Sequence, residues 1–333
     1  MTPPRPEAST SAPTLRRSRL RRLAIVLAAA AVAATTAACG SSGSSGAAPT
    51  TTAAAPATRT VQSAEGPVEV PAQPKRIVSV DYVTPYILFD LKAPIVGALD
   101  LSNGANGEQF KTITPIGNDS GEINYEAIIG LNPDVILSID GSSGVDVARL
   151  KAIAPTVSIP ASTDTSWKGL VKQTAEIVGL SDALAAREQA YQAKVTEVKT
   201  QRAAQITSSG SWATAGTYDG DAWYLYGTGS GPSSVMADLG ITFDTATKAA
   251  GDSLEQRSVE QLNTLSDAKV ILFDDLGPPV TIEGAAAKMQ ANPLFAALPA
   301  AQAKRVYVGS YNVTTYGDAE KVLTSINDIL GKF

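Results

Sequence analysis

The chain contains few of the side chains that carry out covalent or metal chemistry. Histidine is absent from its 333 residues, and Cys39 is the single cysteine. Without histidine the sequence offers no His-ligated metal or haem and no Ser–His or Cys–His nucleophile. One cysteine also excludes a disulfide framework and a zinc site built from cysteines. These features weigh against an enzyme and against direct metal ligation.

Two motifs that look catalytic fit their surroundings poorly. Ser266 and Lys269 have the S-x-x-K spacing of penicillin-recognising enzymes, but they enter the strand pattern VILF, whereas that motif should begin a helix. The segment GTGSG at 227–231 lacks the lysine of a phosphate-binding loop. We expect it to form a turn that caps the next helix or lets backbone amides approach a cleft. We interpret Asp274 and Asp275 as a solvated loop.

Aromatic side chains and one arginine form the stronger candidate site. Tyr82 follows the run RIVSVD and Tyr311 follows VYVGS, and ligands of open α/β sheets bind beyond the carboxyl ends of strands. Arg257 could face an anionic ligand with its planar fork of donors. Such a set suits a bulky metal chelate better than a bare ion. The ligand-binding candidates are Tyr82, Tyr86, Trp223, Tyr224, Arg257, Tyr311 and Tyr316.

Each candidate also has a structural interpretation. Core packing explains Tyr86 and Tyr224 about as well as ligand contact does. Arg257 has acidic neighbours, Glu255 and Glu260, with which it could form a surface ion pair.

The elements that must position these residues are short β-branched runs alternating with helical stretches, the pattern of α/β structure with parallel sheets. Strands are expected at 76–80, 95–98, 135–139, 270–273 and 306–308. YEAIIGLNPDVIL, which begins at Tyr125, parallels VEQLNTLSDAKVIL, which begins at Val259. This internal similarity favours two similarly built lobes, at 61–181 and 206–333. A second similarity joins AQPKRIVSVDY to AQAKRVYVGSY.

One long helix is expected between the lobes, at 182–205. Its apolar residues recur at helical spacing and form one narrow stripe: Leu184, Tyr191, Val195, Val198 and Ile206. Ser181 is a candidate N-cap. A long helix with a single apolar stripe suits a rigid bridge.

The N-terminal segment has the features of an export signal. Six arginines precede the apolar run LAIVLAAAAVAATTAA at 23–38, which is too short to span a bilayer comfortably. The ending TAAC resembles the bacterial lipobox, whose cysteine is acylated after cleavage. We therefore expect a signal peptide at 1–38 and a lipidated Cys39 with a Gly-, Ser-, Ala-, Pro- and Thr-rich tether at 39–60. A plain secretory signal with an incidental cysteine is the alternative.

The remaining chain is acidic. Subtracting the leader's six basic and one acidic residues from the totals of 27 and 32 leaves 21 and 31, a net charge of −10. This charge argues against a nucleic-acid partner.

Over about residues 61–333 the sequence resembles the class III substrate-binding lipoproteins of ABC importers, of the type that binds ferric siderophores, haem or cobalamin. The resemblance rests on an ordered set of segments: PAQPKRIVSVDYVTPYILFDLKAPIVGALD, INYEAIIGLNPDVIL, YLYGTGSGPSSVMADLGI, SVEQLNTLSDAKVILF and FAALPAAQAKRVYV. It implies two Rossmann-like lobes bridged by one long α-helix, with ligand held between the lobes. It also implies that Glu126 and Glu260 pair with arginines of a membrane permease.

These observations together predict a monomeric, non-enzymatic carrier outside the cytoplasm, anchored to the cell membrane by its lipid. Its ligand would be a ferric siderophore and its partner an ABC permease, with no cofactor. Haem and cobalamin remain alternative ligands. A surface scaffold or scavenger lipoprotein without an importer role is the alternative function.

Lipidation of Cys39 can be tested directly. One acyl chain gives marginal membrane binding, whereas two or more hold a protein firmly. Substituting Cys39→Ala should therefore move the protein from the membrane fraction to the medium, measured by immunoblotting of the two fractions. An unchanged distribution would argue against lipidation at this residue.

Overall fold

The computed structural model describes residues 57–102, 107–118, 120–142, 144–160, 166–275 and 282–333. The expected signal peptide, Cys39 and most of the expected tether lie outside these residues. Strand β1 (Thr58–Ser63) pairs with β2 (Gly66–Pro71) in an antiparallel hairpin, so the last three residues assigned to the tether form strand instead. No helix in the described residues is long and apolar enough to cross a membrane.

The N-terminal lobe contains a parallel five-stranded sheet with the order β5-β4-β3-β6-β7. Its strands are β3 (Ile77–Ser79), β4 (Ile95–Ala98), β5 (Thr114–Pro115), β6 (Val135–Ile139) and β7 (Thr156–Ile159). The residues of β3 and β7, and all but the last residue of β6, are buried, as expected for parallel strands whose two faces are covered. The three strands expected in this lobe are confirmed.

Helices lie between and after these strands, and three of them start at a side-chain cap. They are α1 (Thr84–Asp90), the 3₁₀ helix η1 (Gly107–Thr112), α2 (Tyr125–Leu131), α3 (Val147–Lys151) and α4 (Trp167–Val178). Asn124, Asp146 and Ser166 cap α2, α3 and α4, each accepting a hydrogen bond from a backbone N–H three residues on.

The C-terminal lobe has a mixed five-stranded sheet with the order β10-β9-β8-β11-β12. Its strands are β8 (Trp212–Thr217), β9 (Ala222–Tyr226), β10 (Leu254–Ser258), β11 (Val270–Asp275) and β12 (Val306–Gly309). Strands β8, β11 and β12 are parallel, while β9 runs antiparallel to its neighbours. The two strands expected here, now β11 and β12, are confirmed. Asp274 is a fully buried residue of β11, so its assignment to a solvated loop was wrong.

The remaining helices of this lobe vary in length from one turn to four. They are α7 (Gly231–Leu239), α8 (Thr245–Ala250), the 3₁₀ helix η2 (Val259–Leu265), α9 (Ile282–Ala291), α10 (Pro293–Ala296), α11 (Pro299–Gln302) and α12 (Tyr316–Leu330).

The two sheets share one connectivity. Numbering the strands from one to five within each lobe gives the order 3-2-1-4-5 in both, the order of a Rossmann-like sheet. The similar segments YEAIIGLNPDVIL and VEQLNTLSDAKVIL become α2 with β6 and η2 with β11, so both lead into the fourth strand of their lobe. The second similarity relates β3 to β12, the first strand of one lobe and the last of the other. It therefore does not mark equivalent positions.

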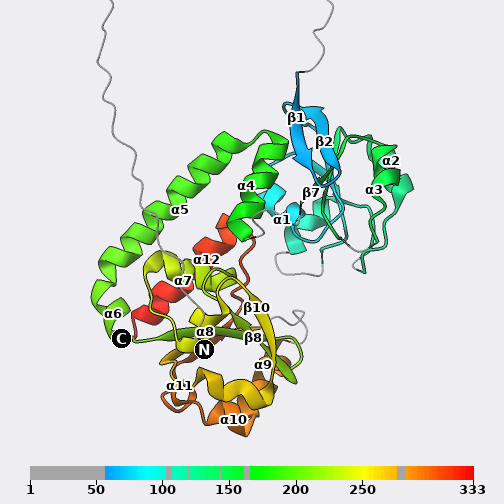
Figure 1. Cartoon of the computed structure of the whole chain (residues 1–333). Coiled ribbons are helices and arrows are strands. Elements are labelled where there is room, and N and C mark those ends of the chain that lie inside the picture. Colours follow the sequence, from blue (N-terminus) through cyan, green and yellow to red (C-terminus); the bar gives the residue numbers. More distant parts are fainter. Residues whose placement is uncertain (1–56, 103–106, 119, 143, 161–165, 276–281) are drawn as a thin grey trace, which may run out of the picture. The chain divides into compact units, whose positions relative to one another are not determined.

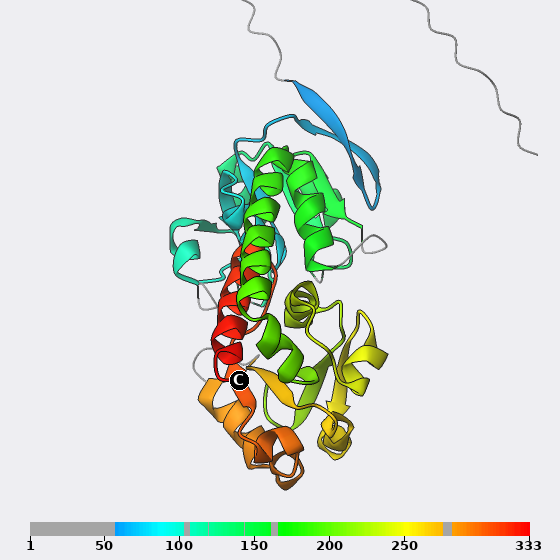
Figure 2. The same ribbon diagram turned by 90° about the vertical axis from the view of Figure 1, so that its left-hand side faces the viewer.

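The bridging helix is α5 (Ser181–Gln201), which continues through Arg202 into the short α6 (Ala203–Ser208). Leu184, Tyr191, Val195 and Val198 are buried along it, as the apolar stripe predicts. Ser181 is the first helical residue rather than the N-cap, and Leu180 holds the cap position. Helix α5 packs against α4 of the N-terminal lobe and against α7 and α12 of the C-terminal lobe (Figures 1 and 2).

Ionic and aromatic contacts fix the bridge to both lobes. Arg187 of α5 binds Asp90 of α1 at 2.9 Å and Glu320 of α12 at 3.0 Å. Trp167 of α4 and Tyr316 of α12 meet edge to face at 4.9 Å between ring centroids, and Tyr191 of α5 packs against both. These aromatic rings belong to one core cluster that receives residues from both lobes.

Arg187 should contribute measurably to stability. Substituting Arg187→Met removes the cation shared by Asp90 and Glu320, leaving two partly buried carboxylates with fewer partners. We expect the free energy of unfolding in urea to fall by about 1–3 kcal/mol. Lys199→Met on the same helix is the matched control, because Lys199 is exposed and donates only to a carbonyl at 3.3 Å. Equal unfolding midpoints for the two variants would contradict this role.

Candidate functional site

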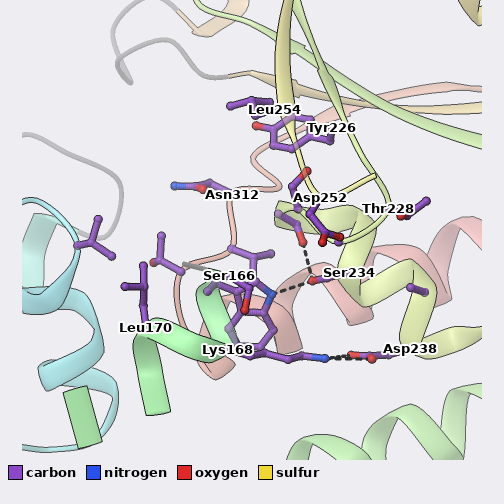
Figure 3. Close-up of a pocket in the computed structure, with 18 of the residues that line it drawn as sticks. Ser166, Lys168, Leu170, Tyr226, Thr228, Ser234, Asp238, Asp252, Leu254 and Asn312 are labelled. Atoms are coloured by element: carbon purple, nitrogen blue, oxygen red, sulfur yellow. Dashed lines mark hydrogen bonds and ion pairs between the residues drawn. The ribbon is translucent and has the colours of Figure 1, made fainter. Parts of the chain in front are cut away.

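A cavity of about 840 Å³ receives residues from both lobes and is the strongest candidate for a ligand site (Figure 3). Its lining combines aromatic rings, hydroxyl groups and glycine backbone: Val83, Ser166, Trp167, Lys168, Leu170, Tyr218, Tyr226, Thr228, Gly229, Ser230, Gly231, Ser234, Ala237, Asp238, Asp252, Leu254, Asn312, Val313 and Thr314.

The cavity lies where the topology predicts a ligand. Val83 follows β3 and Tyr218 follows β8, the first strand of each sheet. In both sheets the strand order reverses at this strand, so the two residues mark the topological switch points. Asn312 belongs to the segment between β12 and α12. The candidate cavity therefore lies beyond strand ends, as predicted for the ligand site, but none of the seven predicted ligand-binding residues lines it.

A buried aspartate holds the turn on the N-terminal side. Asp81 is 2% exposed and accepts hydrogen bonds from the backbone N–H groups of Val83 and Thr84 at 2.8 and 2.7 Å. The Thr84 hydroxyl donates to its other oxygen at 2.6 Å. Burial raises the pKa of Asp81 above its usual value, while these hydrogen bonds act in the opposite direction. This turn places Val83 at the cavity and starts α1.

A second buried aspartate organises the C-terminal wall. The Tyr226 hydroxyl donates to Oδ2 of Asp274 at 2.7 Å, and the backbone N–H of Tyr311 donates to its Oδ1 at 2.7 Å. Burial and then the charge of Asp274 raise the pKa of Tyr226 far above its ordinary value. Tyr226 therefore presents a neutral, fixed ring to the cavity.

The glycine-rich segment shapes the cavity as a turn before α7, as the sequence predicts. Gly231 has φ +47°, in the left-handed region that favours glycine. A Cβ at Gly229 would lie 2.0 Å from Oδ1 of Asp252, so glycine leaves the space that this carboxylate occupies beside the cavity.

Helices α4 and α7 meet at one side of the cavity. Indole Nε1 of Trp167 donates to the Ser234 hydroxyl at 2.7 Å. Lys168 binds both carboxylate oxygens of Asp238, at 2.7 and 3.0 Å (Figure 3). Asp238 also accepts a hydrogen bond from the Tyr191 hydroxyl at 2.8 Å. The cavity wall is therefore joined to the bridging helix.

Two predicted residues of the N-terminal lobe lie outside the cavity lining. Tyr82 is 47% exposed and precedes the lining residue Val83. Tyr86 packs edge to face on Phe110 at 4.8 Å, and burial with the charge of Asp318 raises its pKa.

Trp223 and Arg257 lie on the far face of the C-terminal sheet. Trp223 is fully buried in a core cluster and donates to the Ser258 carbonyl at 2.8 Å. Arg257 pairs with it across β9 and β10, at 5.6 Å from its ring, and binds Glu255 at 2.6 Å. Because side chains alternate along a strand, Trp223 and its cross-strand partner face away from Tyr226. Their assignment to the ligand site is therefore corrected, and the ion-pair alternative for Arg257 is confirmed.

Three predicted tyrosines pack near the cavity without lining it. Tyr224 packs edge to face on the lining residue Tyr218 at 5.2 Å. Tyr311 is 5% exposed, and burial together with the charges of Asp274 and Tyr307 raises its pKa to about 12. Tyr316 packs between Trp167 and Tyr191 and donates to Glu188 at 3.1 Å.

Sequence reasoning did not select three aromatic residues that line the cavity, Trp167, Tyr218 and Tyr226, as candidates. Tyr226 was visible two positions after Tyr224, on the same face of β9. Tyr218 follows β8, which was not recognised as a strand. Trp167 starts α4, and its proximity to α7 has no signal in the sequence.

The two glutamates assigned to docking occupy corresponding places. Glu126 is exposed in the first turn of α2, and Glu260 is exposed in the first turn of η2. Hydrogen bonds from Ser258 and from its own backbone lower the pKa of Glu260. Within the described residues, no group of three or more Cys, Asp or Glu side chains is arranged to hold a metal ion.

Comparison with known proteins identifies the family. A family model described as periplasmic binding protein matches residues 77–311. The iron(3+)-hydroxamate-binding protein YxeB of Bacillus subtilis is 27% identical over 210 residues, covering 62% of this chain and 62% of that protein. The ferric enterobactin-binding periplasmic protein FepB of Escherichia coli is 26% identical over 266 residues, covering 75% of this chain and 83% of the relative.

A solved structure agrees in fold. The siderophore periplasmic binding protein from the fuscachelin gene cluster of Thermobifida fusca has a TM-score of 0.63 and 26% identity, covering 79% of this chain and 99% of that one. Periplasmic binding proteins bind substrates and do not transform them, which agrees with the non-enzymatic expectation. Because the family model spans more than half of the sequence, the chain belongs to the periplasmic binding protein family.

Proposed function

We propose that this protein is an extracytoplasmic lipoprotein that captures a ferric siderophore between its lobes and delivers it to an ABC permease. The observation that carries the proposal is the cavity of about 840 Å³ lined by both lobes at their switch points. This volume falls within the range of roughly 300–1,000 Å³ typical of small-molecule sites.

The lining suits a chelate better than a bare ion. Trp167, Tyr218 and Tyr226 offer aromatic faces, and the cavity contains many hydroxyl groups. A bare metal ion would require several oxygen, nitrogen or sulfur ligands converging on one point. A chelate brings its own ligands to iron and needs only an enclosing surface with a few hydrogen bonds. The names of two relatives support this class, because one is described as binding an iron(3+)-hydroxamate and the other ferric enterobactin.

Presentation to the permease would use Glu126 and Glu260. The two residues begin the helical segments that lead into β6 and β11, the fourth strands of the two lobes. Both are exposed, so each carboxylate is available to a cationic partner. Two separated charges would fix the orientation in which the protein docks on the permease. They would also speed the encounter of the two proteins more than they would raise the affinity between them.

Capture can be tested with a matched pair of tyrosines. Tyr218 lines the cavity and is 50% exposed, whereas Tyr82 lies outside the lining and is 47% exposed. Loss of an aromatic contact in a binding pocket typically costs about 1–3 kcal/mol, roughly a five- to hundredfold loss of affinity. Tyr218→Ala should weaken chelate binding by that factor, and Tyr82→Ala should leave it within about twofold. Binding is measured by quenching of tryptophan fluorescence, since Trp167 lines the cavity.

The ligand panel separates the alternatives. It contains ferric trihydroxamate, tris-catecholate and citrate complexes, haem and cobalamin. If only haem or only cobalamin bound, that compound, and not a ferric siderophore, would be the ligand. Failure of the whole panel would favour the scaffold function. If Tyr82→Ala weakened binding and Tyr218→Ala did not, the cavity would not be the site.

Docking makes a separate prediction about uptake. Reversing both charges with Glu126→Lys and Glu260→Lys should reduce cellular uptake of the bound chelate at least about tenfold, because both contacts would become repulsive. Affinity in solution should stay near that of the parent. The control is the double reversal Glu69→Lys and Glu197→Lys, at exposed positions on β2 and α5. Undiminished uptake, or an equal loss in the control, would remove Glu126 and Glu260 from docking.

A further inference from the structure

The charge balance of the cavity bears on which ferric chelates it accepts. Of the 27 lysines and arginines in the chain, six precede Cys39, and the other 21 all lie within the described residues. Lys168 is the one among these 21 that lines the cavity. Its charge is already engaged by both oxygens of Asp238, at 2.7 and 3.0 Å. The site therefore contains no lysine or arginine free to neutralise an anion.

Arg257, on the same strand as a lining residue, faces away from the cavity. Arg257 and Leu254 are three residues apart on β10, so their side chains project from opposite faces of the sheet. Leu254 lines the cavity, whereas Arg257 binds Glu255 and donates to the Thr264 hydroxyl at 3.1 Å.

The second carboxylate of the lining, Asp252, forms no ion pair with the described lysines and arginines. Asp252 is exposed, and its side chain occupies the space left open by Gly229. The N-termini of α4 and α7 also border the cavity, and their caps Ser166 and Ser230 line it. Each helix end carries about half a positive charge. Together they offset one carboxylate, which leaves the cavity close to neutral.

This balance matters because the classes of ferric chelate differ in charge. Three singly charged hydroxamates cancel the charge of Fe³⁺, so the complex is neutral, or cationic where a free amine remains. Three doubly charged catecholates leave the complex triply negative. Transferring such an anion from water into a cavity without free cations is unfavourable, because its lost hydration is not replaced by opposite charge. A neutral chelate needs only hydrogen bonds and packing.

Resting on the proposed function, we infer that the cavity selects ferric trihydroxamates and rejects triply anionic tris-catecholates. The hydroxamate oxygens would accept hydrogen bonds from hydroxyl groups and backbone N–H groups at the two helix starts. The aromatic faces of Tyr218 and Tyr226 would pack on the hydrocarbon arms. Asp252 is the residue at which this charge balance can be changed, since it is the carboxylate of the lining that Lys168 does not bind.

The test compares a neutral ferric trihydroxamate with a ferric tris-catecholate in fluorescence titrations of the full chain. The parent should bind the trihydroxamate at least about tenfold more tightly. Asp252→Lys should reduce the ratio of the trihydroxamate affinity to the tris-catecholate affinity by about tenfold. Asp252→Asn should reduce this affinity ratio less. Raising the salt concentration should weaken catecholate binding by the Lys variant, because salt screens the new attraction. Glu197→Lys, which changes the net charge equally outside the cavity, should leave the ratio unchanged.

The outcomes distinguish the inference from the function on which it rests. Equal or tighter binding of the tris-catecholate by the parent would overturn the charge selection and leave chelate capture standing. A ratio that did not respond to Asp252→Lys, or that responded equally to Glu197→Lys, would also overturn it. Failure of both chelates to bind would overturn the proposed function together with the inference.

Discussion

The Asp238 carboxylate on α7 connects both lobes and the bridging helix at the wall of the cavity. It accepts hydrogen bonds from Lys168 at the start of α4 and from Tyr191 in the middle of α5. One side chain thus joins the N-terminal lobe, the bridge and the C-terminal lobe, and it also lines the cavity. A displacement of α7 relative to α4 would change both this contact and the cavity wall. A ligand can shift the balance between two arrangements of α4 and α7 only if it makes different contacts with each arrangement.

The alternation of side chains along β9 decides which aromatic residues are available to a ligand. Trp223 and Leu225 face the core formed with the helices of the C-terminal lobe, while Tyr224 and Tyr226 face the other way. The alternation of side chains along β9 can be read from the sequence, but the sequence does not show which face of the strand is buried. Packing in the core cluster of the C-terminal lobe buries the face with Trp223 and Leu225, and Asp274 of β11 fixes the Tyr226 hydroxyl on the other face. A buried carboxylate at the end of a central strand therefore orients a wall of the cavity.

The sequence predicted elements whose own residues specify them. Strands β4, β6 and β11 are β-branched apolar runs, and α5 shows its stripe in Leu184, Tyr191, Val195 and Val198. Strand β8 escaped recognition because WATAGT consists mostly of small residues, although it is the middle strand of its sheet. The candidate cavity lies at strand ends, where the sequence places the site, but most of its lining residues differ from the predicted ones. Its lining comes from helix starts and loops distant in sequence, and no local pattern reports that Trp167 meets Ser234.

The equivalence of Glu126 and Glu260 shows what internal similarity can establish. The two glutamates precede the fourth strand in lobes that share one strand order. Their helical segments differ, since α2 is an α-helix capped by Asn124 and η2 is a 3₁₀ helix with a capping box at Ser258 and Gln261. Both segments have an acidic residue in an exposed first turn, where the helix dipole favours it. The dipole would be satisfied equally well by a carboxylate at a neighbouring position in that turn. The proposed contact with a permease would account for the same position in both lobes, because one partner would then contact both glutamates at once.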